Sequence, residues 1–139
     1  MRSTSVAAII VLLVGCIAAV VFGGEDEDAA VEVAEEWLAL VDAGEYDESW
    51  DEAAAYFRRA VTKDDWIASL GAVRTPLGKA TSRTLKGATY VTELPGAPDG
   101  EYVVIQFATA FANKGSAVET ITPMKDEDGR WRVSGYFIR

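Results

Sequence analysis

The spacing of apolar residues changes near residue 80, from a helical period to the two-residue period of a β-strand. Before that point, apolar side chains recur every three or four positions, as on one face of an amphipathic helix. After it, they alternate with other side chains, most clearly from Tyr102 to Phe111. Helices followed by consecutive strands predict an α+β domain, in which the helices pack on an antiparallel sheet.

The helical part divides into three predicted helices, over residues 29–43, over residues 47–61, and from after Thr62 to about residue 73. Thr62 is followed three residues later by an aspartate, which resembles a capping box and marks the start of the third helix. Pro76 disfavours helical geometry in the residue before it, so we expect this helix to end near residue 73 or to kink there.

The second part of the chain divides into four predicted strands. They cover residues 81–93, 102–111, 118–125 and 131–138. Turn-forming residues separate them, at Pro95–Gly100, Asn113–Gly115 and Asp128–Gly129. Short turns between consecutive strands predict an antiparallel meander, and we expect the three helices to cover one of its faces.

The first 24 residues have the pattern of a bacterial export leader, with Arg2 before an apolar run from Val6 to Phe22. Three outcomes remain open. Cleavage near Gly24 would release a periplasmic or secreted domain. Acylation of Cys16, which ends a lipoprotein-like Leu-Val-Gly-Cys sequence, would attach the domain to lipid. Retention of the apolar run would anchor it, because the run approaches the roughly 20 residues that span a bilayer.

The remainder of the chain is long enough for one domain, over residues 29–139, preceded by an acidic linker, Glu25–Asp28. The formal net charge is −9, and removal of Arg2 with the leader leaves −10. Such a surface repels phosphate backbones and anionic lipids. We therefore predict no nucleic-acid partner, and membrane contact only through the N-terminal segment.

Histidine and cysteine, two residue types that many enzymes use for catalysis, are almost missing from the sequence. The sequence contains no histidine, and its one cysteine is Cys16 in the leader. The absence of histidine excludes Ser-His-Asp and Cys-His catalysis and histidine metal sites. The acidic turn Lys125–Gly129 lacks the length and ligand spacing of a calcium loop. We predict no metal site and no cofactor.

Four side chains are candidate site residues, and each also has a purely structural interpretation. Glu119 is expected to point between sheet and helices, where it would act as a general base or would pair with Arg83 on another strand. Arg74 would either bind an anionic ligand or brace its turn. Trp66 and Tyr136 would either stack on a ligand or belong to the core.

Four segments together resemble a known family: Trp37–Tyr46, Ser49–Trp50, Arg74–Gly78 and Asp128–Ile138. It is domain of unknown function 4019, a group of small exported bacterial proteins, and the resemblance covers residues 29–139. The resemblance implies export and a cystatin-like or nuclear-transport-factor-2-like fold, a curved sheet wrapped around a helix. It supplies no catalytic residues.

Two functions remain open from the sequence. The first is a non-enzymatic envelope module that binds an unidentified envelope protein or small ligand, with a homodimer through the sheet face around Val104 and Ala108 as one form. The second is a small cavity enzyme of the isomerase or dehydratase type that uses one buried carboxylate, Glu119. An open cavity holding Glu119 would favour the enzyme, and a filled interior would favour the binding module, which we prefer.

Overall fold

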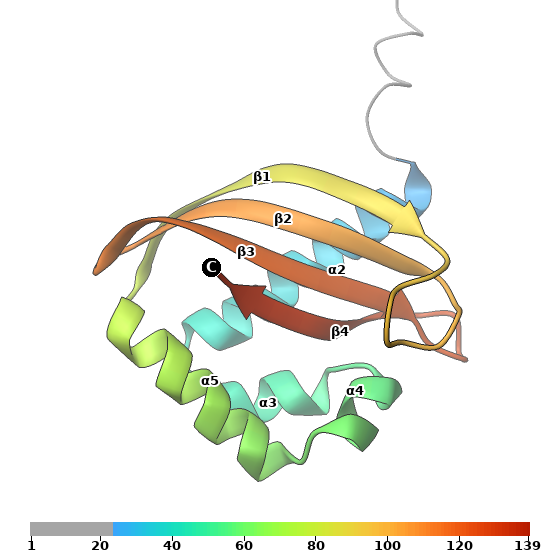
Figure 1. The fold of residues 1–139 in the computed structure, drawn as a ribbon, viewed down its shortest axis with the longest axis horizontal. Coiled ribbons are helices and arrows are strands. Elements are labelled where there is room, and N and C mark those ends of the chain that lie inside the picture. Colours follow the sequence, from blue (N-terminus) through green and yellow to red (C-terminus); the bar gives the residue numbers. More distant parts are fainter. Residues whose placement is uncertain (1–23) are drawn as a thin grey trace, which may run out of the picture.

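The computed structural model describes residues 24–139, which contain four helices and one four-stranded sheet (Figure 1). The helices are α2 (Glu25–Asp42), α3 (Tyr46–Asp51), α4 (Ala55–Ala60) and α5 (Lys63–Leu77). The strands are β1 (Ala80–Val91), β2 (Tyr102–Phe111), β3 (Lys114–Lys125) and β4 (Trp131–Ile138). The predicted leader and Cys16 lie outside the described residues, apart from Gly24.

The sheet is a meander in which each strand pairs antiparallel with the next, in the order β1-β2-β3-β4. The predicted α+β architecture with an antiparallel sheet is therefore confirmed. The strands curve, α2 crosses behind them, and α3, α4 and α5 gather beside β4 (Figure 1). Within residues 24–139, no helix is both long and apolar enough to cross a membrane.

The two faces of the sheet differ in what covers them. Side chains on the face toward α2 are buried and join one core with the apolar side of that helix; from β2 they include Val103, Ile105 and Phe107. The opposite face, called the front face here, is turned toward the viewer in Figure 1, and no described helix crosses it. By strand register, the front face carries Thr89, Val104, Gln106, Ala108, Val118, Thr120, Thr122 and Phe137.

The helix predicted over residues 47–61 is wrong as a single element, because the structure divides it into α3 and α4. At the break, the backbone N–H of Ala54 donates to the carbonyl of Val133 in β4, at 2.8 Å. The next N–H, of Ala55, donates to Asp126 Oδ2 at 3.3 Å. Partners distant in sequence thus replace the intrahelical bonds that would continue α3, and they fix α4 against the sheet.

Two further boundaries differ from the prediction. Helix α5 begins after Thr62, whose hydroxyl caps it as predicted, but it continues through Pro76 to Leu77. Asn113 satisfies its last carbonyls, because its backbone N–H donates to Leu77 and its side-chain amide donates to Pro76. The acids Glu25–Asp28, expected as a linker, form the first turn of α2, where negative charge favours the helix dipole.

Candidate functional site

Glu119, the candidate base, is fully buried in β3 and points toward the helices. Its carboxylate accepts hydrogen bonds from Arg83 Nε at 2.6 Å and Arg83 Nη2 at 3.2 Å. The Thr109 hydroxyl donates to Oε1 at 2.6 Å, and the Tyr136 hydroxyl donates to Oε2. An ionised carboxylate offers about four acceptor positions, so these four donors occupy its whole capacity.

Arg83 also binds a second carboxylate, that of Asp42 at the end of α2. Its Nη1 lies 2.8 Å from Asp42 Oδ2, and its Nη2 lies 3.1 Å from Oδ1. Arg74 of α5 donates to the same Oδ1 at 2.9 Å. Two arginines therefore balance the charges of Asp42 and Glu119, and the bonds tie together α2, α5 and the sheet. We call these residues the Glu119 cluster: Asp42, Arg74, Arg83, Thr109, Glu119 and Tyr136.

The cluster shifts the pKa values of three of its members, Asp42, Arg83 and Tyr136. Burial and the neighbouring negative charge of Glu119 raise the pKa of Tyr136 well above its ordinary value, so the phenol stays protonated and donates. Partial burial opposes ionisation of Asp42, but hydrogen bonds and charges from Arg83 and Arg74 outweigh it and lower the pKa of Asp42. The shifts of Asp42 and Tyr136 favour the charged carboxylate and the protonated phenol that these hydrogen bonds require.

Arg74 lies inside the domain, with only 5% of its surface exposed. Its guanidinium carbon lies 5.1 Å from the centroid of the Phe111 ring, and Nη2 binds Asp42. Its Nε and Nη1 are buried and have no hydrogen-bond partner among residues 24–139. The side chain braces an acid between α5 and α2, and it does not lie at the mouth of an open cavity.

Trp66 and Tyr136 are joined to the core through Trp37. The Trp37 ring lies 6.1 Å from that of Trp66 and meets Tyr136 edge-on at 5.3 Å. Ser49 accepts from both indoles: its carbonyl from Trp37 at 2.8 Å, and its hydroxyl from Trp66 at 2.9 Å. The three aromatic side chains therefore pack against one another between helices and sheet, and Ser49 occupies both indole N–H groups.

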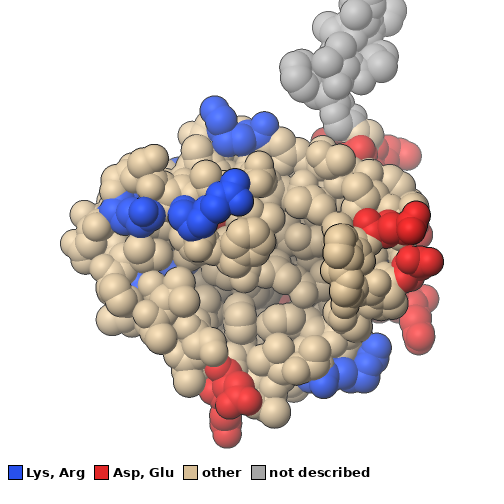
Figure 2. Space-filling model, viewed as in Figure 1, with Lys and Arg blue, Asp and Glu red and all other residues tan. Residues whose placement is uncertain are grey.

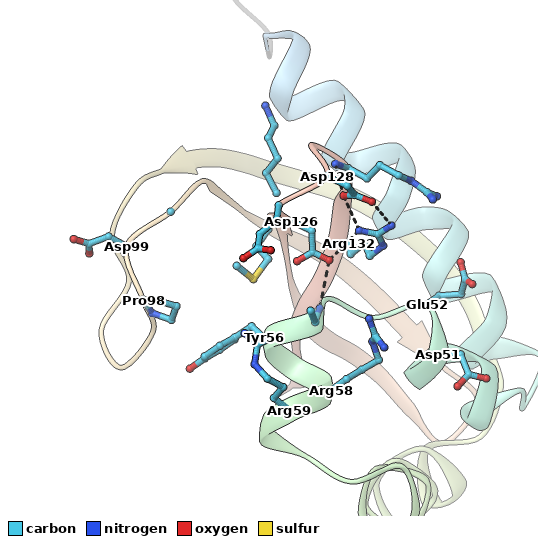
Figure 3. A pocket seen from close by; sticks show the side chains of 16 residues that line it. Asp51, Glu52, Tyr56, Arg58, Arg59, Pro98, Asp99, Asp126, Asp128 and Arg132 are labelled. Carbon is cyan, nitrogen blue, oxygen red and sulfur yellow. Dashed lines mark hydrogen bonds and ion pairs between the residues drawn. The ribbon is translucent and has the colours of Figure 1, made fainter.

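A groove of about 670 Å³ lies between α4, the β1–β2 loop and the β3–β4 hairpin (Figure 3). It is lined by acidic and basic residues in nearly equal number, and we call it the charged groove. Arg132 binds Asp126 at 2.9 Å and Asp128 at 2.8 Å on its wall. The Arg132 hydrogen bond lowers the pKa of Asp128 to about 2. Because the two signs are nearly equal in number, the groove has no dominant sign.

A smaller hollow of about 240 Å³ lies on the front face, under the β1–β2 loop. Its lining is mostly apolar, and we call it the apolar crevice. Leu94, Pro95 and Ala97 of the loop form one side, and Gly135 and Phe137 of β4 form another. Glu119 lines neither this crevice, nor the charged groove, nor a third hollow of about 270 Å³ beside Trp131.

Sequence reasoning identified Glu119, its alternative partner Arg83 and the bracing role of Arg74, but it did not identify Asp42 or Thr109. A signal for Thr109 was available, because it is a polar residue at an inward position of the most apolar strand. Arg83 pairs directly with Thr109 across β1 and β2, so three polar side chains meet at inward positions of adjacent strands. Asp42 carried no comparable signal, because it lies at the end of a helix that is far from the strands in the sequence.

A comparison with curated proteins finds no match. A family model matches residues 33–136, which is most of the chain and almost all of the described domain. This match confirms the resemblance that the sequence motifs predicted. The chain therefore belongs to the family described as protein of unknown function (DUF4019).

Proposed function

We propose that this chain is an exported bacterial envelope protein whose domain is a non-enzymatic binding module. The leader pattern of residues 1–24 supports export, with the domain either free in the periplasm, secreted, or attached through the N-terminal segment. The curved sheet with α2 crossing behind it supports a cystatin-like or nuclear-transport-factor-2-like fold (Figure 1). In this proposal the fold serves as a scaffold for recognition.

The observation that carries the proposal is the hydrogen bonding of Glu119. A general base needs a free lone pair within reach of its substrate, and the four donors from Arg83, Thr109 and Tyr136 leave none. Full burial also keeps the carboxylate out of the described hollows. The one carboxylate suited to a cavity enzyme is thus used to join strands and helices.

The front face is the surface that we propose for binding. The four strands contain a single acidic residue, Glu119, which points the other way, although the sequence has 22 acids. In the view of this face, acidic side chains lie at the margins and basic ones lie over its upper left part (Figure 2). Val104 and Ala108 remain half-buried there because no described helix covers them. An uncovered surface without acidic strand side chains, on an acidic domain, is suited to recognition.

The test places a photo-crosslinking residue on the full chain in a living bacterial cell. Phe137, exposed on the front face, is replaced by p-benzoylphenylalanine, and Glu35, exposed on α2, receives the same residue as the matched control. We expect crosslinked products from position 137 and few from position 35, and we expect added protease to reach the domain once the outer barrier is opened. A cytoplasmic domain, or no product from position 137, would contradict the proposal.

A further inference from the structure

We infer that the front face binds a second copy of this chain, packed face to face about a two-fold axis, with Phe137 of each copy inserted into the apolar crevice of the other. This inference rests on the proposed binding function and names its partner. A two-fold interface must be self-complementary, because the same surface meets itself. The front face meets this condition in shape and in charge.

Phe137 supplies the projecting side chain. It pairs with Thr120 across β3 and β4, which places its ring on the front face. The ring is 54% exposed, whereas the aromatic side chains of β2 are almost fully buried. An exposed aromatic ring on a sheet face to which the strands contribute no acidic side chain is typical of the residues that anchor protein interfaces.

The apolar crevice supplies the matching hollow beside that ring. The loop that forms it is held in place, since the Tyr102 hydroxyl donates to the Pro98 carbonyl at 2.6 Å and the Tyr56 hydroxyl donates to that of Gly96 at 3.3 Å. Gly135 leaves its floor open, because a Cβ there would meet no atom within 4 Å. A crevice built before binding loses little entropy when a ring enters it.

Charge at the two ends of the face favours a second copy over another occupant. Arg139 is exposed and pairs through its backbone with Val118, so it lies in the half of the face nearer the turn between β2 and β3. Glu93 and Asp99 are exposed in the β1–β2 loop at the opposite end. Basic side chains gather toward one side of this face and acidic ones lie at the other margin (Figure 2). A two-fold axis across the strands superposes opposite ends, so each basic end meets an acidic one.

The experiment uses the same p-benzoylphenylalanine at position 137 of the full chain and identifies what it captures. We expect a product with twice the mass of the chain, in which position 137 is joined to residues 94–102 or 134–137 of the second copy. A double-mass product joined instead to the helices would overturn the inference. Products that contain only other proteins would overturn it while leaving the binding function supported, and no product would overturn both.

A second measurement compares matched variants by co-purifying two differently tagged full chains from one cell. Phe137→Asp is expected to reduce recovery of the partner copy at least tenfold. Val73→Asp, at a residue 47% exposed on α5, is expected to leave it unchanged. Gly135→Ala, whose Cβ would occupy the crevice and meet no atom of the domain within 4 Å, is expected to act like Phe137→Asp. Equal recovery from all three variants would overturn the inference.

Discussion

Two arginines in this domain each hold two carboxylates and are similarly exposed, but only one of them holds a carboxylate that is fully buried. Arg83 binds Glu119 and Asp42, and Arg132 binds Asp126 and Asp128, with similar short distances. The partners differ in exposure, since the Glu119 side chain is 0% exposed and that of Asp128 is 51% exposed. Water screens the surface group, whereas the buried one depends on its protein partners alone. Similar geometry should therefore have very different energetic consequences.

The largest expected effect tests the buried side of this comparison. Glu119→Ala leaves the Arg83 guanidinium without its main partner, together with the hydroxyls of Thr109 and Tyr136. We expect the free energy of unfolding to fall by about 3–5 kcal/mol, as for other buried pairs that lose one member. Urea unfolding of the purified protein measures it. A loss below about 1 kcal/mol would mean that the cluster does not hold the fold.

A buried polar contact without charge should give an intermediate effect. Ser49→Ala removes the hydroxyl that accepts the Trp66 indole N–H and donates to the carbonyl of Tyr46 at 2.6 Å. We expect a loss of about 1–3 kcal/mol in the same urea measurement, because the indole donor is left buried and unpaired. Trp66→Phe in the Ser49→Ala background should then cost less than Trp66→Phe alone. Additive losses would contradict the proposed contact.

Alkaline pH should weaken the buried cluster through Tyr136. The pKa of this phenol is raised in the folded state, so the unfolded chain releases its proton first, near pH 10. Stability from Tyr136 is fully present below pH 10 and falls by up to about 1.4 kcal/mol per pH unit above it. Unfolding measured from pH 8 to 11 should show a steeper decline for the wild type than for Tyr136→Phe. Identical slopes would show that the phenol is not coupled to folding.

The smallest effect is expected at Arg132, whose two carboxylate partners are both at least partly exposed. Arg132→Gln removes its bonds to Asp126 and Asp128, yet we expect the free energy of unfolding to change by less than about 1 kcal/mol. The difference from the wild type should shrink further when salt is added, because exposed charges are screened. A loss as large as that of Glu119→Ala would remove the contrast between the two arginines.

The strands were predictable because their signals are local. Pro95–Gly100 and Asp128–Gly129 mark the turns, and alternation marks the buried face of β2. The break between α3 and α4 was not predictable, because it depends on Val133 and Asp126, which lie far away in the sequence. The continuation of α5 beyond Pro76 was also not predictable from local sequence. It depends on Asn113, which is distant in sequence and donates hydrogen bonds to the last carbonyls of the helix.

The candidate site was predictable only in part, for a related reason. Alternation around Ile121 places Glu119 on the inner side, and Arg83 was recognisable as an oppositely charged residue on another strand. Their meeting requires the register of β1, β2 and β3, which no local pattern specifies. The contribution of Asp42 requires the position of α2 across the sheet, which follows from packing of the core.

The most direct test of this account is the coupling energy between Glu119 and Arg83. A double-mutant cycle with Glu119→Leu and Arg83→Met, measured by urea unfolding, isolates their interaction. We predict that each single variant is strongly destabilised and that the double variant recovers part of the loss, with a coupling of about 1.5–3 kcal/mol. A coupling below about 0.5 kcal/mol would show that the carboxylate is not committed to Arg83, and it would reopen a catalytic role for Glu119.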